Sequence, residues 1–94
     1  MTFQPSFRWI FDAVAPEYEA KIIPAFSQMA ENFVEWIAPQ PTDLAVDIGT
    51  GTGIVPRIIA PQVANVIGID FIWRMLQVAK TVSHEKQLSN TYFV

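Results

Sequence analysis

The segment AVDIGTGTG, residues 45–53, constrains the fold of this chain more than any other stretch. Gly49, Gly51 and Gly53 stand at alternate positions directly after a short apolar run that contains Asp47. Glycine permits a turn that is closed to other residues, and its missing side chain lets a ligand approach the main chain. We therefore expect a strand, a ligand-binding loop and then a helix.

Strand and helix patterns alternate around this loop. Leu44 to Ile48 is an apolar run typical of a strand buried on both faces, Val66 to Asp70 is a second, and residues 90–94 begin a third. Two helices are expected, over residues 53–60 and 71–87, where apolar residues recur at helical spacing. Parallel strands need such crossover connections, so the order predicts an α/β fold with a parallel sheet and right-handed crossovers.

The half of the chain before residues 38–43, APQPTD, is helical in pattern. Apolar residues between Ala25 and Ile37 recur at spacings of three and four, which predicts an amphipathic helix. A shorter helix is expected from Phe7 to Ala15, ended by Pro16. Pro24 is expected to break or kink the chain before the longer helix.

Composition excludes several classes of function. The net charge is −3 without a basic cluster, so we expect no nucleic-acid partner. One histidine and no cysteine predict no metal site and no disulfide. The longest uncharged run, Ile58 to Ile69, has 12 residues, whereas a membrane span needs about 18 or more. Charged residues interrupt the N-terminal segment, which is unlike a signal peptide, and a cytoplasmic location is expected.

Two phosphate-binding loops match this sequence poorly. A P-loop needs Lys and Ser or Thr after a glycine five positions beyond the first. Ile54 and Pro56 occupy the two positions where that glycine would stand. The dinucleotide fingerprint GxGxxG places its third glycine five positions after the first. Here Gly53 comes four positions after Gly49.

The two acids near the loop indicate the chemistry of its ligand. Asp47 lies at the carboxyl end of the first strand, and a phosphate about 6 Å away would cost about 3 kcal/mol at an effective dielectric constant of about 20. A nucleoside that carries a sulfonium and an ammonium reverses that sign. Asp70, 17 residues after Gly53, ends the second strand, where a carboxylate can bind both ribose hydroxyls. Asp70 could also cap the helix ahead of Phe71.

At these residues the chain resembles class I S-adenosylmethionine-dependent methyltransferases. VDIGTGTG is similar to the first motif of that family, and VIGIDFIWRMLQVAK is similar to the segment that follows it. FDAVAPEYE, residues 11–19, resembles the N-terminal segment of small-molecule methyltransferases of the ubiquinone and menaquinone group. Those proteins tend to end the segment in Tyr-Asp, whereas this chain has Tyr18 and Glu19.

The resemblance implies a Rossmann-like fold, S-adenosylmethionine as cofactor and a small-molecule acceptor. Residues 1–38 would form a substrate lid or access region, and residues 42–94 a partial cofactor-binding domain, so that the chain is an apparently truncated N-terminal portion. One edge of Leu44–Ile48 would stay unpaired, and copies of the chain could associate through it. The residues implied as cofactor contacts are Asp47, Gly49, Thr50, Gly51, Gly53, Asp70, Phe71 and Ile72.

No catalytic residue is assigned, because methyl transfer from a sulfonium depends mainly on alignment of donor and acceptor. Glu17, Tyr18 and Glu19 are expected at the surface. Two alternatives stay open beside the methyltransferase. One is a non-catalytic truncated remnant that needs a partner, suggested by the missing strands. The other is a fragment of a dinucleotide-binding oxidoreductase, which Ile54 and Asp47 disfavour.

Overall fold

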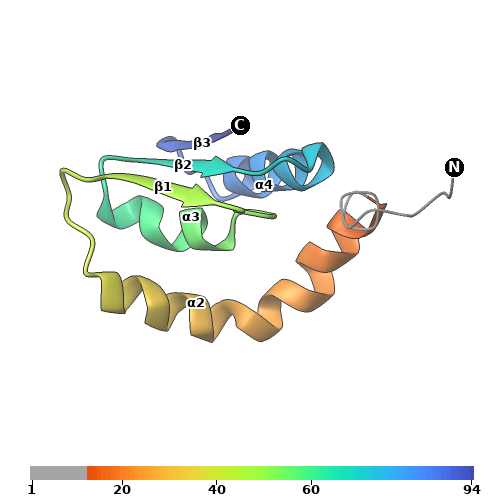
Figure 1. Ribbon diagram of the computed structural model, residues 1–94, viewed down its shortest axis with the longest axis horizontal. Helices are drawn as coiled ribbons and strands as arrows, with labels where there is room; N and C mark the ends of the chain where they lie inside the picture. The colour runs from red at the N-terminus through yellow and green to blue at the C-terminus, as the bar shows by residue number, and fades with distance from the viewer. Residues whose placement is uncertain (1–12) are drawn as a thin grey trace, which may run out of the picture.

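The computed structural model describes residues 13–94, which form a helical segment followed by a small α/β unit (Figure 1). Residues 13–17 are helical and lead into the first named element. The elements in order are η1 (Tyr18–Ile22), α2 (Ile23–Ile37), β1 (Leu44–Ile48), α3 (Ile54–Ile59), η2 (Ala60–Gln62), β2 (Asn65–Ile69), α4 (Trp73–Glu85) and β3 (Thr91–Phe93). The predicted α/β class, with helices before a β-α-β-α-β half-sheet, is confirmed.

The three strands form a parallel sheet in the order β1-β2-β3. Asp47 of β1 lies opposite Gly68 of β2, and Gly68 lies opposite Phe93 of β3. Because parallel strands share one direction, their carboxyl ends meet at the same edge of the sheet. The loop after β1 and the loop after β2 therefore lie next to each other, which brings the glycines close to Asp70.

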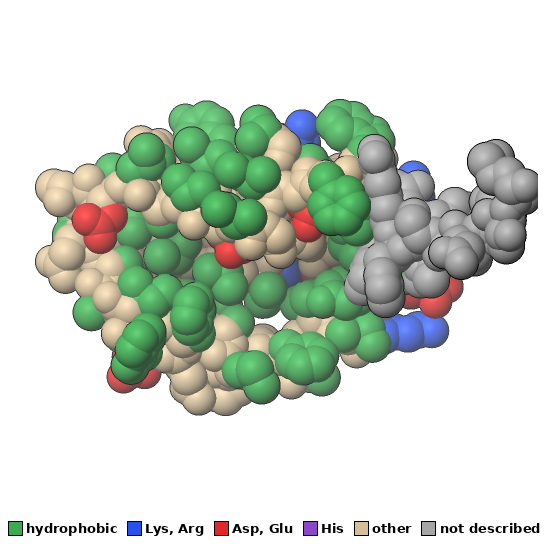
Figure 2. Space-filling view, in the orientation of Figure 1, with side chains coloured by type: hydrophobic (Ala, Val, Ile, Leu, Met, Phe, Trp, Pro, Cys, Tyr) green, Lys and Arg blue, Asp and Glu red, His purple; other side chains and the backbone are tan. Residues whose placement is uncertain are grey.

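Only one face of this sheet is covered by helices within the described residues. Val66 packs with residues of α3 and η2, while Phe93 packs with Leu76 and Ala79 of α4. On the opposite face Leu44 is 61% exposed and Ile48 is 82% exposed. Hydrophobic side chains accordingly gather over the strands in the upper part of Figure 2.

The prediction that Leu44–Ile48 is buried on both faces is therefore wrong. Its apolar residues follow the pattern of an internal strand, but β1 lies at one end of the strand order. A parallel sheet normally has helices on both faces. Here the apolar side chains of the second face have no covering element among residues 13–94.

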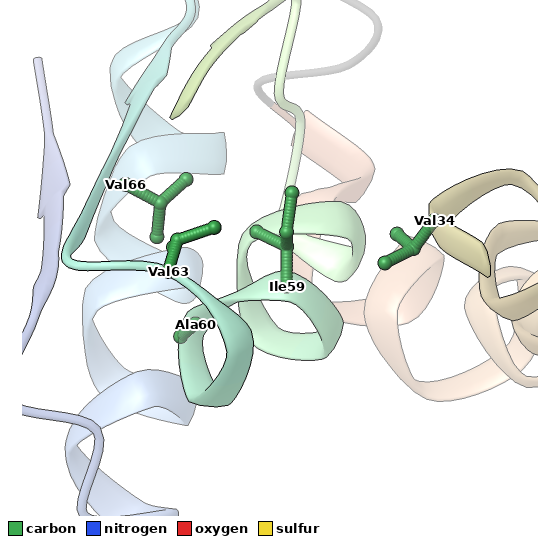
Figure 3. Packing of buried hydrophobic residues seen from close by; sticks show 5 residues of the cluster. All are labelled: Val34, Ile59, Ala60, Val63 and Val66. Carbon is green, nitrogen blue, oxygen red and sulfur yellow. The ribbon is translucent and has the colours of Figure 1, made fainter. Parts of the chain in front are cut away.

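Helix α2 is joined to the α/β unit by one buried cluster (Figure 3). Val34 of α2 is 1% exposed and belongs to the same cluster as Ile59, Ala60, Val63 and Val66. Burying a valine side chain stabilises a fold by about 1.5–3 kcal/mol. This contact fixes α2 beside α3.

Pro24 does not end the helical segment, but the expected irregularity lies directly before it, where the π-helical turn η1 passes into α2 (Figure 1). Pro24 itself lies in the first turn of α2, where a missing N–H group is tolerated. The preceding turn, η1, has π-helical geometry, and such a widened turn often occurs at a functional site. Pro16 lies within helical residues 13–17 and ends no helix there. Most of the helix predicted from Phe7 to Ala15 lies outside the described residues.

The remaining boundaries differ from prediction by a few residues. The helix predicted over residues 71–87 is α4, Trp73–Glu85. Among the described residues, no helix combines the length and the apolar character needed to span a bilayer. The division at residues 38–42 and the cytoplasmic location stay predictions.

Candidate functional site

The glycine loop has the backbone conformation that its sequence predicts. Gly49, Gly51 and Gly53 have φ values of 76°, 59° and 84°. These left-handed conformations favour glycine. A Cβ atom added at Gly49 or Gly51 would meet nothing within 4 Å, whereas one at Gly53 would lie 3.0 Å from the ring of Phe93. The first two glycines thus leave open space, and the third permits close packing.

The loop uses its backbone N–H groups to hold its own shape. Gly49 and Thr50 both donate to the carbonyl oxygen of Ile69, at 2.8 and 2.9 Å. Gly51 donates to the carboxylate of Asp70 at 2.9 Å. A loop that binds phosphate needs such groups for its ligand. These three N–H groups are therefore not available to a phosphate, which agrees with the poor match of the sequence to phosphate-binding loops.

Asp70 connects the loop to the beginning of α4. One carboxylate oxygen accepts from Gly51 N, and the other accepts from Ile72 N at 2.8 Å. Each oxygen keeps capacity for a further hydrogen bond. Ile72, rather than Asp70, occupies the N-cap position of α4. Asp70 thus orders both loops and still offers acceptors to a ligand.

A hollow of about 340 Å³ lies between these two loops and the N-terminal helical segment. Small-molecule sites range from roughly 300 to 1,000 Å³. The residues that line it are Tyr18, Gly49, Gly51, Asp70, Phe71, Ile72 and Met75. Five of these belong to the predicted set. Tyr18 and Met75 were missed, although both fall in segments that carry the family resemblance.

The other three predicted residues do not line this hollow. Asp47 lines a neighbouring groove between α2 and β1. Thr50 is only 5% exposed. Gly53 faces Phe93 and Ala79. A role for these residues in cofactor binding stays a prediction, and the structure gives Gly53 a packing role.

The carboxyl group of Asp47 has a raised pKa. Burial is the main cause, and the negative charge of Asp70 adds to it, while the nearby Thr50 side chain lowers the pKa in part. The two acids therefore interact although they line different hollows. A cation bound between them would relieve their repulsion.

We expect Asp47→Asn to raise the melting temperature at pH 7 and to change its pH dependence. Since the folded pKa is raised, the folded protein takes up a proton before the unfolded chain does. In the wild type, the ionised Asp47 carboxylate therefore destabilises the fold at neutral pH, and this effect disappears as the pH falls and the group is protonated. The difference in melting temperature between the variant and the wild type should shrink between about pH 7 and pH 4. Thermal melts of both proteins across that range measure it. A constant difference would contradict the shift.

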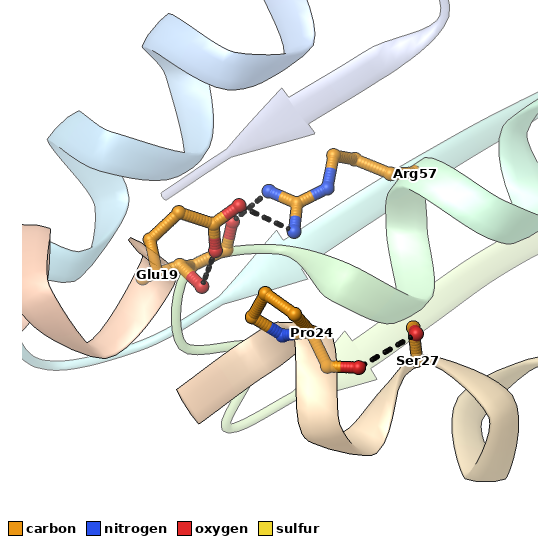
Figure 4. Close-up of polar contacts among 5 residues, drawn as sticks. Glu19, Pro24, Ser27 and Arg57 are labelled. Atoms are coloured by element: carbon orange, nitrogen blue, oxygen red, sulfur yellow. Dashed lines mark hydrogen bonds and ion pairs between the residues drawn. The ribbon is translucent and has the colours of Figure 1, made fainter. Parts of the chain in front are cut away.

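Glu19 is not the surface residue that the sequence suggests. Its carboxylate forms an ion pair with Arg57 Nη2 at 2.7 Å (Figure 4), and the side chain is 18% exposed. Tyr18 is half-buried beside it. The local sequence around Glu19 gave no signal for this contact, because Arg57 lies 38 residues further along the chain.

Comparison with known proteins identifies the class that this fold and loop define. The family described as "Methyltransferase domain" matches residues 46–94, more than half of the chain. The chain belongs to this family, and its resemblance to class I S-adenosylmethionine-dependent methyltransferases is confirmed. The oxidoreductase alternative finds no support in this match.

Individual relatives agree with the family. The 23S rRNA (uracil(1939)-C(5))-methyltransferase RlmD of Tolumonas auensis is 35% identical over 74 residues, which cover 78% of this chain and 17% of that protein. The YcgJ protein of Bacillus subtilis has 25% identity and a TM-score of 0.68 over 71% of this chain and 29% of its own. The structure of DhpI with SAH has 22% identity and a TM-score of 0.72 over 93% and 41%.

These relatives overturn two expectations. RlmD proteins from three bacteria match this chain, and their name specifies ribosomal RNA as the acceptor. The expectations of a small-molecule acceptor and of no nucleic-acid partner are therefore contradicted. The net charge is an average over the chain and does not show where a local RNA-binding surface could lie. This chain spans about 17% of the length of its Tolumonas relative.

Proposed function

We propose that this chain forms the donor-binding part of an S-adenosylmethionine-dependent methyltransferase, with the hollow beside Asp70 as the cofactor site. The observation that carries the proposal is the pairing of Gly51 with Asp70. It places two glycines with open space at their Cβ positions next to a carboxylate, while the N–H groups of Gly49, Thr50 and Gly51 are already hydrogen-bonded within the protein. Family membership supports the same cofactor.

Different residues around the hollow would contact different parts of the cofactor. Gly49 and Gly51 would admit the ligand to the main chain, since neither has a neighbour where a side chain would begin. Asp70 would accept hydrogen bonds from the ribose hydroxyls. Phe71 and Ile72 would contact the adenine. Bound there, the cofactor would supply an activated methyl group on sulfur.

The carboxylates would favour the cationic donor over a phosphorylated nucleotide. Asp70 lines the hollow, and Asp47 lies near enough for the two negative charges to interact. A sulfonium or ammonium group nearby would be attracted to both, whereas a phosphate would be repelled. The protein's own contribution is therefore orientation and charge, which suits a reaction that depends on alignment.

We further propose ribosomal RNA as the acceptor class, on the strength of the curated relatives. This chain has six Lys and Arg residues against nine acids, which is a weak electrostatic basis for RNA binding. Basic surface from other polypeptide would therefore have to supplement it. The donor site and the RNA-binding surface would then be physically separate.

Transfer of a tritiated methyl group from S-adenosylmethionine tests the acceptor. In a cell extract supplemented with unmodified 23S rRNA, we expect this chain to add label to RNA above the level of the extract alone, and this label to become soluble after ribonuclease treatment. Label found only in small molecules from a cell extract would contradict the RNA acceptor but not the donor site. Failure to bind S-adenosylmethionine in a direct binding measurement would contradict the donor site itself.

A further inference from the structure

We propose that Glu19 is a positioning residue that couples the N-terminal helical segment to the cofactor loop. The inference rests on the proposed function, because the coupling concerns the same hollow. Glu19 itself does not line that hollow. Its influence would act through Thr52 in the loop and through its neighbour Tyr18.

Three residues, through two side-chain contacts and one backbone carbonyl, form a closed ring of polar contacts between two distant segments. Arg57 of α3 pairs with one carboxylate oxygen of Glu19 at 2.7 Å (Figure 4). The hydroxyl of Thr52 donates to the other carboxylate oxygen at 2.5 Å. Arg57 Nη1 also donates to the carbonyl oxygen of Thr52 at 2.8 Å. Each member therefore holds both of the others.

This ring is poorly solvated. The side chain of Arg57 is 6% exposed and that of Glu19 is 18% exposed, while Thr52 is completely buried. Hydrogen bonds with ionised partners are stronger than neutral ones, and removing one partner leaves an uncompensated buried charge. The contact between the segments should consequently persist in the folded protein rather than exchange with water.

The position of Thr52 gives the ring its effect on the loop. It stands between Gly51 and Gly53, two residues with positive φ. Glycines alone allow many backbone conformations, so a loop of this composition needs external contacts to hold one. Both the hydroxyl and the carbonyl of Thr52 are fixed by the ring. This restrains Gly51, whose N–H group meets Asp70 at the edge of the hollow.

The same carboxylate positions the other wall of the hollow. Tyr18 directly precedes Glu19 and lines the hollow opposite the loop. Both residues belong to the π-helical turn η1. Docking Glu19 on Arg57 therefore orders the loop and places Tyr18 in one step. Cofactor binding and docking of the helical segment should each favour the other, since coupling between two such events is reciprocal.

Glu19→Gln tests this coupling, because glutamine keeps the size and an acceptor but loses the charge. We expect its dissociation constant for S-adenosylhomocysteine, measured by calorimetry, to rise roughly tenfold, within the range of about 5- to 150-fold typical of coupled sites. Glu17→Gln is the matched control, since it makes the same charge change on an exposed residue of the same segment. It should bind like the wild type.

Limited trypsin digestion reports docking of the segment separately from overall stability. Cleavage after Lys21, next to the ring, should be faster in Glu19→Gln, while cleavage after Lys80 in α4 should be unchanged. S-adenosylhomocysteine should protect Lys21 in the wild type and protect it less in the variant. Because Thr52→Val removes the hydroxyl without leaving a buried charge, it should show the same pattern in milder form.

The outcomes separate the two proposals. Equal affinities of wild type and Glu19→Gln, or protection of Lys21 that is equal in both, would overturn the coupling and leave the cofactor site standing. A wild type that binds no S-adenosylhomocysteine would overturn the proposed function and the coupling that rests on it. Faster cleavage at both lysines would show general destabilisation and would also count against a positioning role.

Discussion

Replacing Asp70 with alanine should weaken binding of S-adenosylmethionine by roughly 100-fold and lower the free energy of unfolding by about 1–3 kcal/mol. The variant loses the acceptors of Gly51 N and Ile72 N, which together hold the two loops. It also loses the acceptors proposed for the ribose hydroxyls. Both losses fall on one carboxylate, so this substitution should be the most damaging to binding.

Asp70→Asn separates the two roles of this side chain. The amide oxygen can still accept one backbone hydrogen bond, so much of the stability should return, but the charge and one acceptor are gone. Calorimetry gives the affinity and thermal melts give the stability of each variant. If Asp70→Ala lost stability while its affinity stayed near that of the wild type, Asp70 would only hold the two loops together and would not be a ligand.

Gly53→Ala should mainly lower stability, whereas Gly51→Ala should mainly weaken cofactor binding. Both positions have positive φ, which costs a non-glycine residue about 1–2 kcal/mol. At Gly53 the new Cβ would also lie 3.0 Å from Phe93 and 3.1 Å from Ala79, and overpacking costs about 1–3 kcal/mol. We expect a stability loss of about 2–4 kcal/mol at Gly53, with a smaller loss at Gly51.

At Gly51 the larger effect should fall on binding. A Cβ there meets no protein atom within 4 Å, and Gly51 lines the hollow, so the added methyl group would occupy ligand space. We expect affinity for S-adenosylmethionine to fall by about tenfold or more, which corresponds to about 1.4 kcal/mol. If Gly51→Ala bound normally and Gly53→Ala did not, the hollow would be the wrong site.

The strands and the site loops could be predicted from the sequence because their signals are local. The glycines directly follow an apolar run, and Asp70 ends the next one, so adjacency in a parallel sheet follows from topology. Five predicted residues consequently line one hollow. The exposed face of β1 was not predictable in this way. The apolar composition of a strand shows that both of its faces are suited to burial. It does not show whether helices cover both faces.

The ring of Glu19, Thr52 and Arg57 could not be predicted, since its members come from elements distant in sequence. Glu19 looks like an ordinary acidic residue of a surface helix until α2 packs on α3 and brings η1 to the loop. Gly68 is a similar case. Its missing side chain makes room for Phe93 and Thr50, since an added Cβ would lie 2.7 Å from an atom of each. These two residues come close to Gly68 only in the folded protein.

Side-by-side calorimetry of the protein with S-adenosylmethionine and with NAD tests the central claim most directly. The claim is that a loop in which the N–H groups of Gly49, Thr50 and Gly51 are already bonded, with two acids nearby, selects a cationic adenosine donor. We predict measurable binding of S-adenosylmethionine that Asp70→Ala weakens by roughly 100-fold, and no detectable binding of NAD. Binding of NAD as tight as that of S-adenosylmethionine, or tighter, would contradict the account.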